Sequence, residues 1–139
     1  MPLDLDLDHT PESATRARRA VRAFVEEVWP ESRTDRVLRD LADDVELVTA
    51  ELVANAIRHG ATPVSLHVRT DSDDDCRSVT ILARDGGAWD DGAPDGDGGR
   101  GLVLVRSLSA QVDLDRSGLG TSVAVRLERP WPSSRTLRP

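Results

Sequence analysis

Lysine and tyrosine are absent from the 139-residue sequence, and cysteine occurs only once. All 18 basic residues are therefore arginines, which excludes any chemistry that needs a lysine, including the phosphate-binding lysine of a Walker motif. Cys76 has no second thiol for an intramolecular disulfide and no companion for a zinc site, so we interpret it as an ordinary residue in or near a strand. Because only one Phe and three Trp are present, the core must be aliphatic.

Long apolar segments are also missing. No run reaches the roughly 20 residues that a membrane-spanning helix needs, and no cationic, apolar leader opens the chain. We therefore expect a soluble, cytoplasmic protein that does not contact a membrane. A formal net charge of −7 argues against nucleic acid as the main partner. The length suits a single domain, which we place at residues 1–129, and the patternless residues 130–139 are predicted to be a disordered tail.

The spacing of apolar residues predicts the order of strands and helices. Period-two alternation predicts strands, and helical spacing predicts helices. The strands are expected at 3–8, 64–68, 79–83, 112–114 and 123–127, and the helices at 14–29, 34–41, 45–60 and 102–110. Ser13 is a candidate cap of the first helix, and Asp43 or Asp44 a candidate cap between the second and third. We predict an α/β fold with one sheet of four or five strands, covered by helices on one face.

The helix expected at 45–60 carries three polar residues on a surface that is otherwise mostly apolar. Glu51, Asn55 and His59 follow one another at intervals of four residues and therefore share one face. A helix that is apolar nearly all round is a buried one, and a buried carboxylate or amide without a partner costs kilocalories. This face is therefore predicted to border a polar site. His59 has a second interpretation, because a histidine in the last turn also interacts favourably with the C-terminus of its helix.

Residues 84–101 contain most of the ten glycines in the protein. At that density of glycine neither a helix nor a sheet ladder is expected. Long loops of this kind in compact domains are usually functional or disordered. A calcium-binding loop is a poor match, because the required ligand spacing and the closing Glu are missing.

A nucleotide site would account for these features together. Gly99–Gly101 leads into the helix expected at 102–110, and backbone N–H groups at a helix N-terminus bind phosphate. The amide oxygen of Asn55 is a ligand that Mg²⁺ accepts. Asp85, at the end of a strand, can accept a hydrogen bond from the exocyclic amine of adenine. Glu51 lies one turn from Asn55 and could serve as a base for chemistry at the γ-phosphate.

Four short motifs, taken in this order, resemble those of the GHKL ATPase superfamily, which includes gyrase, heat-shock chaperone, histidine kinase and mismatch-repair ATPases. The segment ELVANAIRHG looks like the N-box of that family, and three glycine boxes follow it: Asp85-Gly86-Gly87, Gly99-Arg100-Gly101-Leu102 and Gly118-Leu119-Gly120-Thr121. The resemblance covers roughly residues 10–128 and is greatest to the small anti-sigma-factor serine kinases of the RsbW type. It implies the Bergerat fold, a two-layer α/β sandwich with a mixed, mostly antiparallel sheet.

The same resemblance implies roles for the motif residues. Glu51 corresponds to the catalytic Glu, Asn55 to the magnesium ligand and Asp85 to the adenine-binding Asp. The rest of the nucleotide site would comprise His59, Gly87, Gly99, Arg100, Gly101, Leu102 and Thr121. Arg100 also has a plain interpretation as a solvated surface group. The chain departs from the family pattern at Trp89, where many members have a further glycine, and this leaves the shape of the lid open.

Three functions are compatible with this resemblance. The first is a kinase that uses ATP and Mg²⁺ to phosphorylate a serine of an anti-sigma-factor antagonist and that also sequesters a sigma factor. The second is a nucleotide-binding regulatory module without kinase activity. The third is a detached ATPase domain of a histidine kinase, which ranks last because we expect no phosphoacceptor helix pair before the first helix. The sequence names neither the sigma factor nor the antagonist, and it leaves open whether the protein forms a homodimer.

Overall fold

The computed structural model describes residues 2–59, 64–87, 97–117 and 120–131, and the structural statements below concern these residues. In chain order the elements are β1 (Leu3–Leu7), α1 (Glu12–Val28), a 3₁₀ turn η1 (Pro30–Arg33), α2 (Arg36–His59), β2 (Val64–Ser72), β3 (Cys76–Asp85), α3 (Asp97–Leu108), β4 (Gln111–Ser117) and β5 (Gly120–Pro130). Every strand that the period-two alternation predicts is present.

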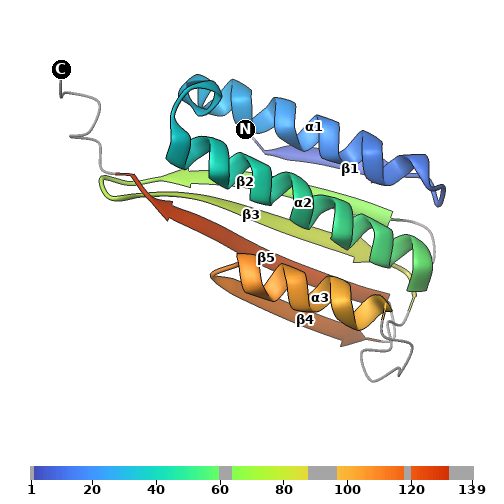
Figure 1. Cartoon of the computed structure of the whole chain (residues 1–139). Coiled ribbons are helices and arrows are strands. Elements are labelled where there is room, and N and C mark those ends of the chain that lie inside the picture. The colour runs from blue at the N-terminus through green and yellow to red at the C-terminus, as the bar shows by residue number, and fades with distance from the viewer. Residues whose placement is uncertain (1, 60–63, 88–96, 118–119, 132–139) are drawn as a thin grey trace, which may run out of the picture.

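The strands form one five-stranded sheet in the order β1-β2-β3-β5-β4. All four pairings are antiparallel, so the predicted α/β fold is confirmed, with an antiparallel sheet in place of a mixed one. Figure 1 shows α1, α2 and α3 side by side in front of the sheet, which gives two layers. The sheet therefore has one face covered by helices and one face that no described helix covers.

The core lies between these layers and is built mainly from aliphatic side chains, as predicted. Alternate residues of the central strands point into it and are fully or almost fully buried: Val64, Leu66 and Val68 of β2, Val79, Ile81 and Ala83 of β3, and Val123, Val125 and Leu127 of β5. The helices contribute a matching apolar face, with Ala17, Val21 and Val25 of α1 among its buried residues. Since each strand buries one face only, the alternation in the sequence was a reliable signal.

The end of β5 lies beyond the predicted domain boundary at residue 129. The strand continues to Pro130, and Trp131 is 4% exposed within the core. The backbone N–H of Trp131 donates to the carbonyl of Asp75 at 2.9 Å, and the Arg77 guanidinium lies 4.3 Å from the centroid of the indole. Trp131 therefore belongs to the folded domain, while the predicted tail from residue 132 onward lies outside the described residues.

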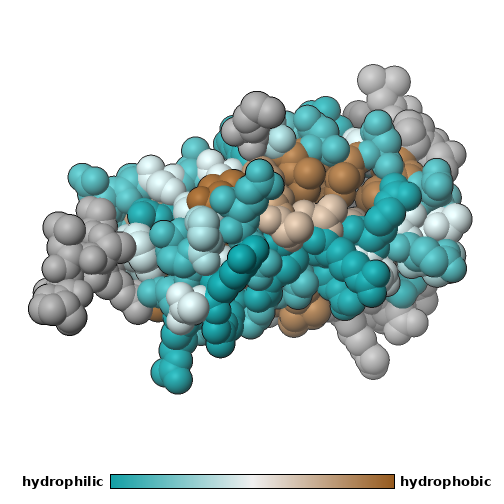
Figure 2. All heavy atoms as spheres, turned by 90° about the horizontal axis from the view of Figure 1, so that it is seen from above, coloured by the Kyte–Doolittle hydropathy of each residue, from teal (hydrophilic) through white to brown (hydrophobic). Residues whose placement is uncertain are grey.

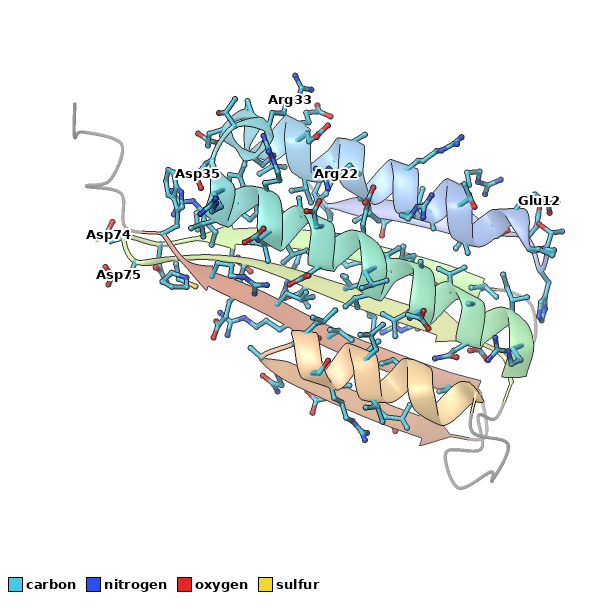
Figure 3. The ribbon with its side chains drawn as sticks, in the orientation of Figure 1. Glu12, Arg22, Arg33, Asp35, Asp74 and Asp75 are labelled. Atoms are coloured by element: carbon cyan, nitrogen blue, oxygen red, sulfur yellow. The ribbon has the colours of Figure 1, made fainter. Side chains whose placement is uncertain are left out.

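One long helix replaces the two that the sequence predicts over 34–41 and 45–60. Helix α2 runs without a break through 24 residues, and its first turn is capped by Asp35, whose carboxylate accepts the Leu38 N–H at 3.0 Å. Figure 3 shows Asp35 at the start of this helix. The helix is also not buried on every side, because Leu47 is 41% exposed. The prediction of a helix buried on every side is therefore wrong at that position.

Asp43 and Asp44 lie in the middle of α2 and are not caps. The Arg22 guanidinium of α1 donates to the Asp43 carboxylate at 2.6 Å, and Arg129 of β5 pairs with Asp44. Figure 3 shows Arg22 between the two helices. The hydrogen bond to Asp43 is the main cause that raises the pKa of Arg22 above its ordinary value. These acidic residues therefore connect α2 to its neighbours instead of interrupting it.

The predicted cap at Ser13 is also wrong. Helix α1 begins at Glu12, and the residue before it, Pro11, makes no side-chain cap. Ser13 lies inside the first turn, is 2% exposed, and donates its hydroxyl to the Asp8 carbonyl at 2.6 Å. The hydroxyl therefore stabilises the connection from β1 to α1. It does not cap an N–H group of the helix.

The surface at the edge formed by α1 and β1 is mostly hydrophilic, with a hydrophobic stretch in its middle (Figure 2). Leu3 and Leu5 of β1 and Phe24 of α1 are among the hydrophobic residues that are only partly buried. Among the described residues, no helix combines the length and apolar character needed to cross a bilayer.

The thiol of Cys76 is partly buried in β3, and its burial is the main cause that raises its pKa, which fits an unreactive strand residue.

Candidate functional site

Four segments that are far apart in the sequence meet at one end of the molecule. Figure 1 shows the last turns of α2, the end of β3, the start of α3 and the start of β5 at this end. Helix α2 packs against α3, β3 and β5. The structure therefore brings the motif segments predicted from the sequence into one region.

Helix α2 contributes a buried amide with an unsatisfied donor. Asn55 is 2% exposed, and its Nδ2 atom has no hydrogen-bond partner among the described residues. Glu51 lies one turn earlier on the same face and is partly exposed. A buried polar group without a partner costs about 1–3 kcal/mol, so native proteins rarely retain one without a reason. Ser32, Thr49 and Trp131 each carry such an atom as well, and among the described residues only that of Asn55 lies within one of the four sequence motifs. Asn55 is therefore the member of this set that is best placed to complete its hydrogen bonding with a ligand.

The ends of β3 and β5 bring together three predicted site residues. Asp85 is 6% exposed, and its Oδ1 atom accepts the Gly87 N–H at 2.7 Å. Thr121 is 2% exposed, and its hydroxyl donates to the Gly87 carbonyl at 2.9 Å. Asp85 and Thr121 are also direct partners in the pairing of β3 with β5. A carboxylate and a hydroxyl are thus fixed next to each other at this end of the sheet.

Gly120 is not among the site residues that the sequence predicts, although it belongs to the third glycine motif. Its φ is +134°, a conformation that L side chains rarely adopt. A Cβ at this position would lie 2.1 Å from the Asp85 carbonyl oxygen and 3.0 Å from the Gly86 Cα. Only glycine lets β5 begin this close to the end of β3. The signal in the sequence was a glycine directly before Thr121.

Helix α3 starts earlier than the sequence predicts. It begins at Asp97, so Gly99, Arg100, Gly101 and Leu102 form its first turns and do not precede it. The expectation that no helix forms among these glycines is wrong, because the fully buried Val105 anchors the helix and a first turn needs few internal hydrogen bonds. The backbone N–H groups of this turn have no partner within the helix, and they carry the positive end of its dipole.

Several predicted features lie outside the described residues. These include residues 88–96, with the predicted lid and Trp89, and the side chains of His59, Arg100 and Leu102. Their assigned roles therefore stay predictions. His59 is the last residue of α2, and the carbonyl of Ile57 near that helix end accepts a hydrogen bond from the His9 ring. His9, from the turn after β1, therefore contacts the C-terminal end of α2.

A family model for the histidine kinase-like ATPase domain matches residues 7–127, which is most of the chain. The chain belongs to the histidine kinase-like ATPase family. The GHKL resemblance noted in the sequence is thereby confirmed, and an ATP-binding domain follows from this membership. No curated protein matches the chain in sequence.

Two solved structures resemble this histidine kinase-like ATPase domain. One is the crystal structure of the RsbU and RsbW domains of Rv1364c from Mycobacterium tuberculosis, with 24% identity and a TM-score of 0.64 over 95% of the present chain. The present chain spans only 34% of that protein. The other is the histidine kinase domain of a blue-light activated kinase from Erythrobacter litoralis, with 16% identity and a TM-score of 0.49 over 84% of this chain and 59% of the other. The first likeness supports the fold.

The described residues of the domain fit ATP and Mg²⁺. The unpartnered Nδ2 atom of Asn55 is a hydrogen-bond donor, which suits a phosphate oxygen, and the oxygen of the same amide is of the kind that Mg²⁺ accepts. Asp85 is a buried carboxylate, which suits an amine donor. The first turn of α3 presents backbone N–H groups of the kind that bind phosphate. No cluster of three or more His, Cys, Asp or Glu side chains suited to a metal occurs in the described part of the chain.

Replacing Gly120 with Ala is expected to destabilise the domain. The strained backbone alone costs about 1–3 kcal/mol for a residue with a side chain, and the contact with the Asp85 carbonyl adds to this. Urea unfolding measures the loss. Ser122→Ala, two residues further along the same strand and only partly buried, is the matched control and should change the free energy of unfolding by less than about 0.5 kcal/mol. A Gly120→Ala domain as stable as this control would show that β5 starts differently.

Proposed function

We propose that this domain is an ATP- and Mg²⁺-dependent serine kinase that acts on an anti-sigma-factor antagonist and sequesters a sigma factor. The observation that carries the proposal is the unpartnered Nδ2 atom of Asn55, one turn from Glu51, on a helix whose last turns lie at the same end of the fold as the end of β3 and the start of β5. Further support comes from Rv1364c, the structural neighbour that contains an RsbW domain. The proposal combines a site suited to a nucleotide with a carboxylate suited to a hydroxyl substrate.

In the proposed complex, the predicted site residues share the binding of the nucleotide. The Asn55 amide oxygen holds Mg²⁺, the Asp85 carboxylate accepts from the adenine amine, and the first turn of α3 binds the phosphates. Gly87, Gly99 and Gly101 let the backbone approach the nucleotide closely, with Thr121 beside the base. His59, Arg100 and Leu102 complete the proposed site. When bound, the metal neutralises charge on the phosphates and orients them.

Glu51 is proposed as the base. Its carboxylate takes the proton from the serine hydroxyl of the antagonist as the serine oxygen bonds to the γ-phosphorus. The bond between that phosphorus and the β,γ-bridging oxygen breaks, and ADP leaves with the electron pair. Because phosphoryl transfer depends mainly on positioning and electrostatics, the spacing of Glu51 and Asn55 by one helical turn is the relevant geometry.

A phosphotransfer assay tests the proposed function directly. The protein is mixed with Mg²⁺, γ-labelled ATP and a small candidate antagonist protein that forms a complex with it. We expect label on a serine of the antagonist. Tight ATP binding together with a verified complex but no transferred label would contradict the kinase and leave a nucleotide-binding regulatory module.

Selectivity for adenine over guanine is expected to depend on Asp85. The carboxylate accepts from the exocyclic amine of adenine, whereas guanine presents an oxygen that the negative charge repels. A charged hydrogen bond of this kind gives a preference of about 10–150-fold for ATP over GTP. Asp85→Asn should bring the ratio of the two dissociation constants close to 1, because an amide can face either group. Asp113→Asn, on an exposed position of β4, is the control. Equal binding of ATP and GTP by the unmodified protein would contradict the assignment.

A further inference from the structure

Helix α2 is held at its C-terminal end by a side chain from a distant part of the chain. The Nε2 atom of His9 donates to the carbonyl of Ile57, and because a carbonyl oxygen can only accept, this nitrogen carries the proton. The last four carbonyls of a helix have no partner within it, and that of Ile57 is one of them. His9 therefore caps the C-terminal end of α2 from outside the helix.

The turn that carries His9 is itself fixed by hydrogen bonds. The Ser13 hydroxyl donates to the Asp8 carbonyl at 2.6 Å, and the Ser13 N–H donates to the Thr10 carbonyl at 3.1 Å. The end of β1, from which the turn begins, pairs with the start of β2 in the sheet. Figure 1 shows this turn at the same end of the molecule as the last turn of α2. The cap thus connects the end of α2 both to the sheet and to α1.

The cap acts on the part of α2 that carries the proposed metal ligand. Asn55 lies two residues before Ile57 and about one turn from the end of the helix, where uncapped helices fray most readily. Its Nδ2 atom has no partner among the described residues, so the amide is placed by the helix backbone and not by a hydrogen bond from that atom. A restraint on the backbone at Ile57 is therefore also a restraint on the position of the amide.

We propose that His9 is a positioning residue for the metal: by capping α2, it holds the Asn55 amide in the orientation that binds Mg²⁺ together with the phosphates of ATP. This inference rests on the proposed function, in which Asn55 is the metal ligand. Loss of the cap should lower the part of the ATP affinity that depends on Mg²⁺. The part that depends on adenine should remain, because Asp85 lies on β3 and not on α2.

The test measures ATP affinity by calorimetry with Mg²⁺ and with a chelator. The unmodified protein should bind at least about tenfold more tightly with the metal. His9→Leu removes the donor and should reduce this advantage to less than about threefold, as losses of residues that orient metal ligands do. Its affinity in the chelator should stay within about twofold, which also shows that the domain is folded.

Two further substitutions separate the hydrogen bond from the bulk of the ring. The side-chain amide of His9→Gln reaches about as far as Nε2, so this variant should retain most of the advantage that Mg²⁺ gives. His9→Asn reaches only as far as Nδ1 and should lose it, as His9→Leu does. A His9→Asn protein that matches His9→Gln would overturn the inference.

Hydrogen exchange without nucleotide tests the restraint on the helix independently of binding. In His9→Leu the backbone amides of residues 55–59 should exchange faster, while those of 41–48 should be unchanged. Unchanged exchange at 55–59 would show that the cap does not hold the helix end, and it would overturn the inference.

A double substitution shows whether His9 acts through Asn55. In an Asn55→Ala background, His9→Leu should cause no further loss of the advantage that Mg²⁺ gives, because the residue it positions is already changed. Additive losses would overturn the inference. So would a His9→Leu protein that keeps the full advantage, or one that loses affinity equally with and without the metal. An unmodified protein that binds ATP no more tightly with Mg²⁺ would instead overturn the metal site of the proposed function, and this inference with it.

Discussion

Glu51→Gln is expected to slow phosphoryl transfer by about 10²–10⁴-fold, the usual contribution of a positioned base. The substitution keeps the shape of the side chain and removes the charge that accepts the proton. ATP affinity should change by less than about threefold, because the proposed nucleotide contacts come from Asn55, Asp85 and the start of α3. Single-turnover transfer of label to the antagonist, measured beside calorimetric ATP titration, separates the two effects.

Glu46→Gln is the matched control for this experiment. Glu46 lies on the same helix, and its carboxylate is 3.7 Å from the Arg22 guanidinium, in the group of charges between α1 and α2. The variant should transfer phosphate at nearly the normal rate. A Glu51→Gln protein that is as active as Glu46→Gln would exclude Glu51 as the base. Loss of ATP binding in Glu51→Gln would instead show that its carboxylate contributes to the nucleotide site.

Asn55→Ala is expected to lower the affinity for ATP in the presence of Mg²⁺ by at least about tenfold, with a much smaller change when the metal is chelated. The reason is that the amide is proposed as the protein's ligand to the ion. Comparing titrations with Mg²⁺ and with a chelator isolates this contribution for each protein. Equal affinity of the two proteins in the presence of Mg²⁺ would contradict the assignment.

The same variant gives an independent result in the absence of nucleotide. A buried amide that served only the fold would be fully hydrogen bonded, and its removal would cost about 1–3 kcal/mol. Since the Nδ2 atom has no partner among the described residues, Asn55→Ala should change the free energy of unfolding by less than about 1 kcal/mol. Stability retained while binding is lost would be typical of a residue kept for its ligand.

The strands could be predicted from the sequence because each buries one face only. The pattern Val79, Ile81, Ala83 in β3 shows this, since the side chains between these residues lie on the uncovered face. The prediction of a break within α2 is wrong for a different reason. Aspartate is a common N-cap residue, so the sequence alone favours a cap at Asp43 or Asp44. Only the fold shows that Arg22 and Arg129 contact these residues from other elements. Local sequence does not contain those contacts.

The candidate site residues could be selected from the sequence, because Asn55 and Asp85 are polar residues within otherwise apolar segments, and their roles toward a nucleotide stay predictions. The contacts that connect the candidate site residues could not be predicted. The contact between Thr121 and Gly87 depends on the register of β5 against β3, and the need for Gly120 depends on how closely the two strand ends approach. The start of α3 was misplaced because burial of Val105 outweighs the weak helix preference of the glycines before it.

Hydrogen exchange with and without ATP and Mg²⁺ tests the location of the site most directly. The structure has a hollow of about 470 Å³ away from the proposed site, on the uncovered face of the sheet, lined by Asp4, Asp6, Ser65, His67, Leu82 and Arg84 among others. We expect nucleotide to slow exchange in residues 49–59, 85–87, 97–105 and 120–123, and to leave 3–7 and 64–69 unchanged. Slower exchange along β1 and β2 alone would place the nucleotide on the uncovered face and contradict the site proposed at the meeting point of α2, β3, α3 and β5.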